Sequence, residues 1–172
     1  DQCWLKQNLD VGVMINGNKN PSNNGIIEKY CYNNSPNNCA FYGAFYKWNE
    51  AMMYQVTPGS QGICPDGWHI PTQREFETLA AAVGNYGNAL KGAGQGSGAG
   101  AGTNASGFSA LLTGNRSTDY NFYNLTGGTY FWSSSDNQTY TPYFIYLDQS
   151  NDFILGGGYS KDFGFSVRCL KN

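Results

Sequence analysis

Charged residues are scarce in this chain. Asp, Glu, Lys and Arg make up 13% of its 172 residues, and the formal net charge is −2 at pH 7. A protein that binds nucleic acid or anionic lipid carries a basic patch or a polybasic segment, and this composition supplies neither. We therefore expect no nucleic-acid partner.

Long apolar runs are also missing. No stretch approaches the roughly 20 residues that a helix needs to cross a bilayer. The opening "DQCWLKQNLD" has neither a basic leader nor an apolar signal core. We expect a mature protein or a trimmed domain without a membrane-spanning segment. The length suits a single domain over residues 1–172, and we expect a monomer.

The residue types of common catalytic and metal sites are few. His69 is the only histidine, and the five cysteines form no CxxC pair, which argues against a zinc site. Neither a nucleophile nor an orienting acid accompanies His69, so we interpret it as a structural residue of the turn "CPDGWHIPT". The sequence thus predicts a protein that is not an enzyme, with no catalytic residue, no cofactor and no metal.

Acidic residues give two weak alternatives. Glu75 with Glu77, or Asp148 with Asp152, could form a glycosidase pair, but Glu75 is better explained as part of a helix cap and the other pair lies in a loop-like stretch. Asp148, Asn151 and Asp152 group oxygens that could bind calcium, although their spacing matches no defined calcium loop. We favour an Asx-rich turn there, and calcium at these three residues stays open.

Glycine, tyrosine and asparagine are abundant. A surface built from amides and hydroxyls, with 13 Tyr and 23 Gly, is typical of a secreted or surface-displayed protein rich in β structure. Cys31 and Cys39 bracket the turn-rich "YNNSPNN", which predicts a local disulfide. Cys64 and Cys169 are predicted as a second bridge, with Cys3 as an alternative partner for Cys169.

The clearest predicted element is the helix "PTQREFETLAAAVG". Thr72 is its N-cap, Glu75 completes a capping box and Gly84 can end it. A weaker helix is expected in "AFYKWNEAMMYQV", whose apolar side would carry Phe45, Trp48, Met52 and Val56. Everything after Phe108 is expected to form short strands and loops.

The glycine-rich stretch "LKGAGQGSGAGAGTNASG" is predicted to be a mobile surface loop, because it offers few side chains to bury. A phosphate-binding loop would need a strand before it, a helix after it and a Lys-Ser/Thr ending. None of these is present in the sequence pattern, so we do not assign a phosphate site.

The order of several motifs resembles a known family. The motifs are "WLKQNLDVG", "EKYCYNN", "YGAFYKWNEAM", "QGICPDGWHIPTQREFETL", "SGFSALLTGNR", "YFWSSS" and "GFSVRCLKN". They cover nearly the whole chain and closely resemble the domain family named for the Fibrobacter succinogenes major paralogous proteins, which are bacterial exported or surface modules. The resemblance implies an extracellular or cell-surface location, in a prokaryote or a phage.

The same motifs look like the wider C-type-lectin-like fold. This resemblance implies an α+β fold with short twisted antiparallel sheets, long loops, a helix on each side and the two termini in one sheet. The formylglycine-generating sulfatase-activating enzymes share that fold and depend on redox or metal-binding cysteines near their C-terminal part, where this chain has only Cys169. The calcium-dependent sugar site of animal lectins relies on E-P-N or Q-P-D and a later W-N-D, where this chain has "TPY" and "SND". Neither site is carried over.

Variable proteins of diversity-generating retroelements resemble this chain more sharply. Their variable segment is framed by "WSSS" and "GxSVR", and it changes because Asn codons are miscopied. In the segment 136–163 only Gln138, Gln149 and Lys161 cannot arise in that way. We assign residues 116–163 as the variable or ligand-binding segment.

The strand "YFIYLDQ" suggests how that segment binds. Ile145 and Leu147 alternate with Phe144, Tyr146 and Asp148, which predicts a half-buried strand with aromatic rings facing outward. Tyr gives a large contact area at a small rotamer cost, so Tyr-rich surfaces suit binding. We expect ten side chains to cluster on one exposed face: Tyr120, Tyr123, Tyr140, Tyr143, Phe144, Tyr146, Asp148, Phe153, Tyr159 and Phe163.

A rigid frame is expected beneath this face. It would consist of Trp68, Phe108, Trp132 and the "GFSVR" strand, with Ile145, Leu147, Val167 and Trp132 buried on the opposite side. The sequence therefore predicts a non-enzymatic ligand-binding module for an unknown protein or glycan, with the variable protein of a retroelement as its specific form. The alternatives are a glycan-binding adhesin-like surface module and an oxidoreductase of the sulfatase-activating branch.

Overall fold

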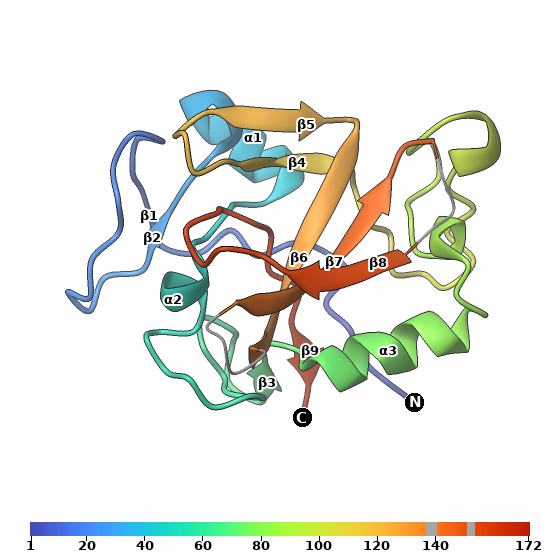
Figure 1. The fold of residues 1–172 in the computed structure, drawn as a ribbon, viewed down its shortest axis with the longest axis horizontal. Helices are drawn as coiled ribbons and strands as arrows, with labels where there is room; N and C mark the ends of the chain where they lie inside the picture. Colours follow the sequence, from blue (N-terminus) through green and yellow to red (C-terminus); the bar gives the residue numbers. More distant parts are fainter. Residues whose placement is uncertain (137–140, 151–153) are drawn as a thin grey trace.

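A five-stranded sheet forms the centre of the fold, with the strand order β5-β4-β6-β7-β8 (Figure 1). The computed structural model describes residues 1–136, 141–150 and 154–172. The strands are β4 (Thr113–Arg116), β5 (Phe122–Leu125), β6 (Gly128–Asp136), β7 (Pro142–Asp148) and β8 (Ile154–Gly158). Neighbouring strands are antiparallel except β4 and β6, which are parallel. Together with the helices, these sheets make the α+β class that the sequence predicts.

Two short ladders complete the strands. β1 (Val13–Met14) pairs in parallel with β2 (Glu28–Lys29), and β3 (Trp68–His69) pairs antiparallel with β9 (Leu170–Lys171). Trp4 forms a bridge with Leu170, and the Lys171 amide donates to the Cys3 carbonyl at 2.9 Å. The two ends of the chain therefore lie side by side, at the lower edge of Figure 1.

The strongest sequence prediction, the helix after Thr72, is confirmed as α3 (Gln73–Ala82). The Thr72 hydroxyl accepts from the Glu75 amide at 3.3 Å, and the Glu75 carboxylate accepts from the Thr72 amide at 2.7 Å. This reciprocal pair is the predicted capping box. Short 3-10 turns are η1 (Tyr32–Asn34), η2 (Gly87–Ala89) and η3 (Gly98–Gly100).

The weaker predicted helix is largely wrong. Only α2 (Trp48–Ala51) is helical, because Phe45 and Tyr46 are extended and form bridges with Tyr30 and Phe165. Val56 is exposed rather than part of an apolar side. A helix that the sequence did not predict, α1 (Pro36–Tyr42), begins inside the Cys31–Cys39 loop. Its Pro36 lies in the first turn, where the missing amide proton costs nothing.

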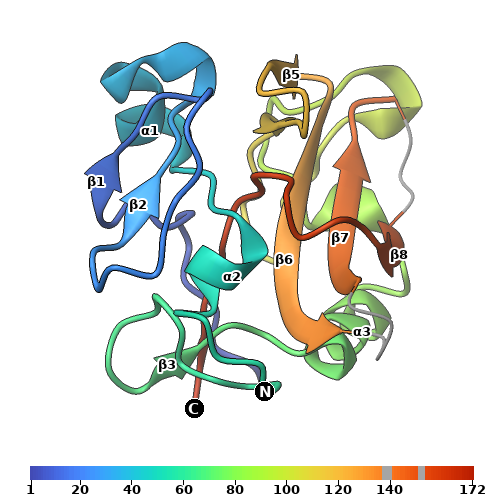
Figure 2. The same cartoon turned by 60° about the vertical axis from the view of Figure 1, so that its left-hand side comes forward.

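Strand β6, in the middle of the central sheet, is covered on both faces. Phe131 and Trp132 are neighbours in β6, so their side chains point to opposite faces, and both are fully buried. On one face α3 covers Phe131, Ile145 and Leu147, which we call the helix-facing core. The other face, which we call the aromatic face, is formed around Trp132, Tyr130, Phe144, Tyr146 and Phe165. Trp48 of α2 packs in the same cluster, so α2 and α3 lie on different sides of β6 (Figure 2).

Both predicted disulfides are present. Cys31 pairs with Cys39 at a Cα–Cα distance of 5.0 Å, and Cys64 pairs with Cys169 at 5.9 Å. Cys3 is a free, exposed thiol, so the alternative pairing of Cys3 with Cys169 is not formed. The second bridge ties the "CPDGWHIPT" turn to the C-terminal strand.

The glycine-rich stretch is packed against the sheet instead of forming a free loop. The buried ammonium group of Lys91 donates to the Gly100 carbonyl at 2.5 Å and to the Asp148 carbonyl at 2.6 Å. A Cβ atom on Gly100 would lie 2.3 Å from the Gln149 carbonyl oxygen, so only glycine allows this approach. We predicted a mobile loop because this stretch has few side chains to bury. The close approach of its backbone to the chain around Gln149 shows that backbone atoms also pack here.

Candidate functional site

A small pocket lies on the aromatic face, between the β4–β5 hairpin and the chain that follows β8. Its volume is about 230 Å³. We call it the aromatic pocket, and it is lined by Asn115, Ser117, Tyr123, Asn124, Tyr130, Tyr159, Phe163 and Phe165. Six of these eight residues carry a hydroxyl or an amide group, and none carries a carboxylate, an ammonium or a guanidinium group.

The base of the pocket is continuous with the core. Phe165 is fully buried, and its ring stacks on that of Tyr130 with centroids 4.6 Å apart and planes 16° apart. The Trp132 ring lies 4.2 Å from Phe165 on the same face, and the Trp132 indole NH donates to the Tyr46 carbonyl at 2.8 Å. Rings fixed in this way form a rigid base for the pocket.

Two exposed tyrosines stand on either side of the pocket. Tyr159 is 39% exposed, and its ring is 4.8 Å from Phe163 and 4.9 Å from Phe144. Tyr123 is 45% exposed, and its hydroxyl donates to the Asp119 carboxylate at 2.6 Å. Each ring is thus held in one orientation before any ligand arrives, which lowers the entropy cost of binding.

Asp119 is well placed to hold Tyr123. Hydrogen bonds from the Tyr123 hydroxyl and then from Asn121 lower the pKa of the Asp119 carboxyl to about 2. The carboxylate is therefore ionised at neutral pH. The next residue, Tyr120, has a left-handed backbone with φ of 72°, and its exposed ring lies 4.8 Å from the guanidinium carbon of the buried Arg116. This backbone conformation belongs to the turn between β4 and β5.

Two amides in the pocket have weak hydrogen bonds. Asn115 is only 5% exposed, and its side-chain oxygen accepts from the Asn124 amide at 3.4 Å. The same Asn124 amide nitrogen lies 3.5 Å from the Tyr130 hydroxyl. Both distances are long for hydrogen bonds. Among the residues that the structure describes, the Asn115 side chain has no shorter bond, so it keeps capacity for a ligand.

Tyr146 and Asp148 lie beside the pocket on β7. The Tyr146 ring is 4.6 Å from the Tyr130 ring and crosses Gly128, where a Cβ atom would lie 2.5 Å from it. The Tyr146 hydroxyl donates to one Asp148 oxygen at 2.8 Å, and Ser150 donates to the other at 2.6 and 2.7 Å. Burial raises the pKa of Tyr130 and Tyr146, so both phenols are neutral at physiological pH.

The structure brings together only part of the predicted binding set. Tyr123, Tyr159 and Phe163 line the pocket, Tyr146 and Asp148 flank it, and Tyr120 is exposed at the turn between β4 and β5. Tyr140 and Phe153 lie outside the described residues. The binding role of these residues stays a prediction.

Two placements in that set are wrong. Phe144 is only 4% exposed, because the rings of Phe165 and Tyr159 cover it. Tyr143 points to the other face of β7, where it lines a cavity with Gln73 and Glu77 of α3. The alternation of side chains along β7 is as predicted. The face that carries Phe144 was expected to be exposed, but other rings cover it, so both faces of β7 are buried at Phe144 and Ile145.

The frame expected beneath the binding face also needs correction. Ile145 and Leu147 are buried in the helix-facing core, as predicted. Trp132 and Val167 instead share the cluster of Phe144, so they lie on the same side as the predicted binding residues. Phe108 belongs to the helix-facing core, and Trp68 is half-buried beside the other cluster.

Sequence reasoning missed Tyr130, Asn115 and Asn124, whereas Phe165 lies in the "GFSVR" segment that was predicted as part of the frame. A signal for Tyr130 was present, because it lies two residues before Trp132 and directly opposite Tyr146 in the register of β6 and β7. Side chains two apart on a strand share a face. No comparable local signal marks the two asparagines, since their meeting depends on the pairing of β4 with β5.

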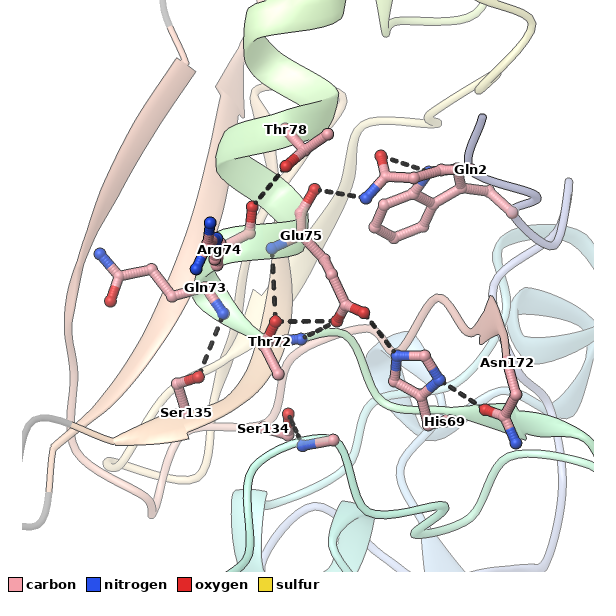
Figure 3. A network of polar contacts seen from close by, with 12 residues as sticks. Gln2, His69, Thr72, Gln73, Arg74, Glu75, Thr78, Ser134, Ser135 and Asn172 are labelled. Atoms are coloured by element: carbon pink, nitrogen blue, oxygen red, sulfur yellow. Dashed lines mark hydrogen bonds and ion pairs between the residues drawn. The ribbon is translucent and has the colours of Figure 1, made fainter.

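A second polar network joins α3 to the end of the chain (Figure 3). His69 Nε2 lies 3.0 Å from a Glu75 oxygen, and His69 Nδ1 lies 2.7 Å from the Asn172 side-chain oxygen. Ser134 accepts from the Gly59 amide at 2.9 Å, and Ser135 accepts from the Gln73 amide at 3.1 Å in the first turn of α3. The Ser134 amide also donates to the Pro71 carbonyl at 2.8 Å, so the "WSSS" and "GWHIPT" motifs meet and fix α3 against β6.

Metal sites and membrane-spanning helices were also considered. Within residues 1–136, 141–150 and 154–172, no three His, Cys, Asp or Glu side chains are grouped so that they could hold a metal ion. Over the same residues no helix is long and apolar enough to cross a membrane.

The fold and pocket define a disulfide-bonded α+β module with an uncharged, tyrosine-lined pocket. Residues 1–171 match the family model of the Fibrobacter succinogenes major domain, so the chain belongs to this family, as its motifs suggest. Neither the curated proteins nor the solved structures compared with the chain gave a match.

Proposed function

We propose that this chain is a non-catalytic ligand-binding module that holds its ligand in the aromatic pocket. The observation that carries the proposal is the combination of exposed, pre-positioned tyrosines with amides whose hydrogen bonds are weak. Rigid aromatic rings supply contact area, and amides supply directional bonds, which are the two components of a recognition site. Because the base of the pocket is core, these groups keep their positions when a ligand binds.

The chemistry of the lining supports a binding role over a catalytic one. General acid–base catalysis needs a group that titrates near neutral pH, and nucleophilic catalysis needs an activated Ser, Cys, Lys or carboxylate. The pocket offers neutral phenols and amides, with Ser117 as its only aliphatic hydroxyl. The rival role, an oxidoreductase of the sulfatase-activating branch, would use Cys169, and that thiol is bonded to Cys64.

An exported or cell-surface location is part of the proposal. Two disulfides suit an oxidising compartment. We also propose a relationship to the C-type-lectin-like fold. Its support is that the terminal segments pair with each other and that a helix lies on each side of β6.

A more specific form of the proposal is the variable protein of a diversity-generating retroelement. Six of the eight lining residues fall within residues 116–163, the segment assigned to variation. The buried position of Phe144 implies that variation there is restricted to large apolar residues, whereas the exposed Tyr159 is free to change. A reverse-transcriptase gene next to the gene for this chain, with a near-copy of the segment that differs at adenines, would establish this form. Natural variants that carry polar residues at position 144 would contradict the restriction.

The binding role is tested on two immobilised panels, one of neutral and acidic glycans and one of random peptides. Wild-type protein is compared with the double variant Tyr123→Ser, Tyr159→Ser and with Phe41→Ala, which removes an exposed ring outside the pocket. We expect a signal on at least one panel that the double variant loses and Phe41→Ala keeps. Equal signals from all three proteins would refute the proposal. Mass spectrometry of the bound ligands checks catalysis, and conversion that depends on Tyr159 would show an enzyme.

A further inference from the structure

We infer that the aromatic pocket binds one ring of a neutral carbohydrate, through stacking and hydrogen bonds from its own side chains. This inference rests on the proposed binding function and names the class of ligand. Three properties of the pocket carry it: its size, the chemistry of its lining and the state of its amides.

The size favours a single ring. The pocket volume of about 230 Å³ is below the range of roughly 300 to 1,000 Å³ that is usual for sites of larger small molecules. A single pyranose ring is compact enough for such a space. The rest of a glycan would extend out of the pocket, past the exposed ring of Tyr159.

The lining matches the two kinds of surface on a sugar ring. One face of a pyranose presents C–H groups, and these pack on aromatic rings such as Tyr159 and Tyr123. Its edge presents hydroxyls, each of which is both a donor and an acceptor. Six lining residues carry a hydroxyl or an amide, so the pocket can meet several hydroxyls at once. An aliphatic or aromatic side chain of a peptide would leave most of these groups without partners.

The amides of Asn115 and Asn124 point to a ligand rich in hydroxyls. Their mutual bond is 3.4 Å long, and the bond from Asn124 to Tyr130 is 3.5 Å. Asn115 is nearly buried, so its weak bond is costly, and the cost is removed when a ligand supplies a closer partner. A pair of neighbouring hydroxyls can donate to the Asn115 oxygen and accept from the Asn124 nitrogen.

The charge of the lining disfavours acidic sugars and phosphates. The lining contains no cationic side chain, so a carboxylate placed there would lose hydration without gaining an ion pair. Asp119 lies behind Tyr123 and adds a negative charge close by. Neutral rings are therefore preferred to uronic acids of the same shape.

Saturation-transfer NMR with methyl glycosides tests the inference. The probes are the methyl glycosides of glucose, galactose and mannose, and the methyl glycoside of glucuronic acid is the charged comparison. We expect at least one neutral glycoside to bind and the glucuronide to bind at least about tenfold more weakly than the matching glucoside. A chelator such as EDTA should leave binding unchanged.

Matched variants locate the probe. Tyr159→Ala should weaken binding at least about tenfold, whereas Tyr159→Phe, which keeps the ring, should stay within about threefold of wild type. Asn124 has φ of 63°, so Asn124→Gly removes the amide and keeps the backbone, and it should weaken binding about five- to tenfold. Phe41→Ala should change nothing.

The outcomes separate the inference from the proposed function. If no neutral glycoside binds, or if Tyr159→Ala and Asn124→Gly leave the binding unchanged, the carbohydrate inference is wrong. Should peptides alone then bind in a way that depends on Tyr159, the module still binds ligands and only the ligand class is refuted. If the binding of neither glycans nor peptides depends on Tyr123 and Tyr159, the carbohydrate inference and the proposed binding function are both wrong.

Discussion

The two faces of the central sheet differ in how completely they are covered, although the same strands form both. The helix-facing core is closed by α3 and consists mostly of Leu, Phe, Ile and Ala side chains. The aromatic face is only partly closed, and its rings pass from fully buried Trp132 and Phe165 to exposed Tyr159 within one continuous set of contacts. A binding surface therefore need not be separate from a core. Here the same aromatic set supplies stability at one end and contact area at the other.

The largest expected effect tests whether the aromatic face is core at its buried end. Trp132→Ala should lower the free energy of unfolding by about 3 to 5 kcal/mol, because it leaves a large cavity and a Tyr46 carbonyl without its indole partner. Phe131→Ala, on the helix-facing side, should cost a similar amount. Urea denaturation of both variants measures this. A loss of less than about 1 kcal/mol for Trp132→Ala would mean that only the helix-facing core stabilises the sheet.

A smaller effect is expected at the exposed end of the same face. The triple variant Tyr120→Ser, Tyr123→Ser, Tyr159→Ser should lower the melting temperature by only a few degrees, because each change lies at the surface. Thermal unfolding followed by circular dichroism is the measurement. Unfolding of the triple variant at room temperature would show that the exposed rings are part of the core and that the two ends are not distinct.

The smallest expected effect is the loss of stability at acidic pH. It involves the Glu75 carboxyl at the start of α3 and the Asp119 carboxyl beside the aromatic pocket. Burial raises the pKa of the Glu75 carboxyl, but hydrogen bonds from Thr72 and His69 outweigh it, so the folded pKa is lowered. Glu75 therefore stabilises the fold above its unfolded pKa of about 4.3, and this contribution is lost as the pH falls through the folded value. The Asp119 carboxyl, with a pKa of about 2, should hold Tyr123 until the pH falls to about that value.

Carbon NMR of the two carboxyl groups checks these values. We expect the Asp119 resonance to titrate near pH 2 and the pocket resonances to stay constant above about pH 3. Glu75→Gln should remove the acid-dependent part of the stability that Glu75 supplies. An Asp119 resonance that titrates at or above its ordinary value of 3.8 would show that the Tyr123 ring is not held as the structure has it.

Features that depend on residues close in the sequence were predicted correctly, and several features that depend on contacts between distant segments were not. The capping box of α3 is written within four residues, Thr72 to Glu75, so the sequence alone locates it. In contrast, Phe45 has helical spacing with Trp48, yet the pairing of Phe45 with Tyr30 decides its conformation. A contact between distant segments overrides a local pattern when it buries more surface.

The candidate site shows the same limit. Alternation along β7 correctly separated Ile145 from Phe144, but the sequence did not reveal that Phe165 would cover Phe144. The Asn115–Asn124 contact depends on the β4–β5 hairpin, whose residues carry no strong strand pattern. The tyrosines could be predicted as a set because their number is unusual. Their division into buried, half-buried and exposed rings required the fold.

The pairing of the two chain ends has a mechanical consequence. If residues 1 and 172 were pulled apart, the bond between Lys171 and Cys3 and then that between Leu5 and Cys169 would open one after another, as in a zipper. When two antiparallel segments are pulled apart from the same end, their hydrogen bonds break one at a time. Each bond then bears the whole force, so little force is needed. On the C-terminal side the opening stops at Cys169, where the covalent bond to Cys64 carries the tension into the turn before β3. The β4–β5 hairpin, which forms one side of the aromatic pocket, lies at the opposite edge of the molecule in Figure 1 and therefore far from the two ends that are pulled.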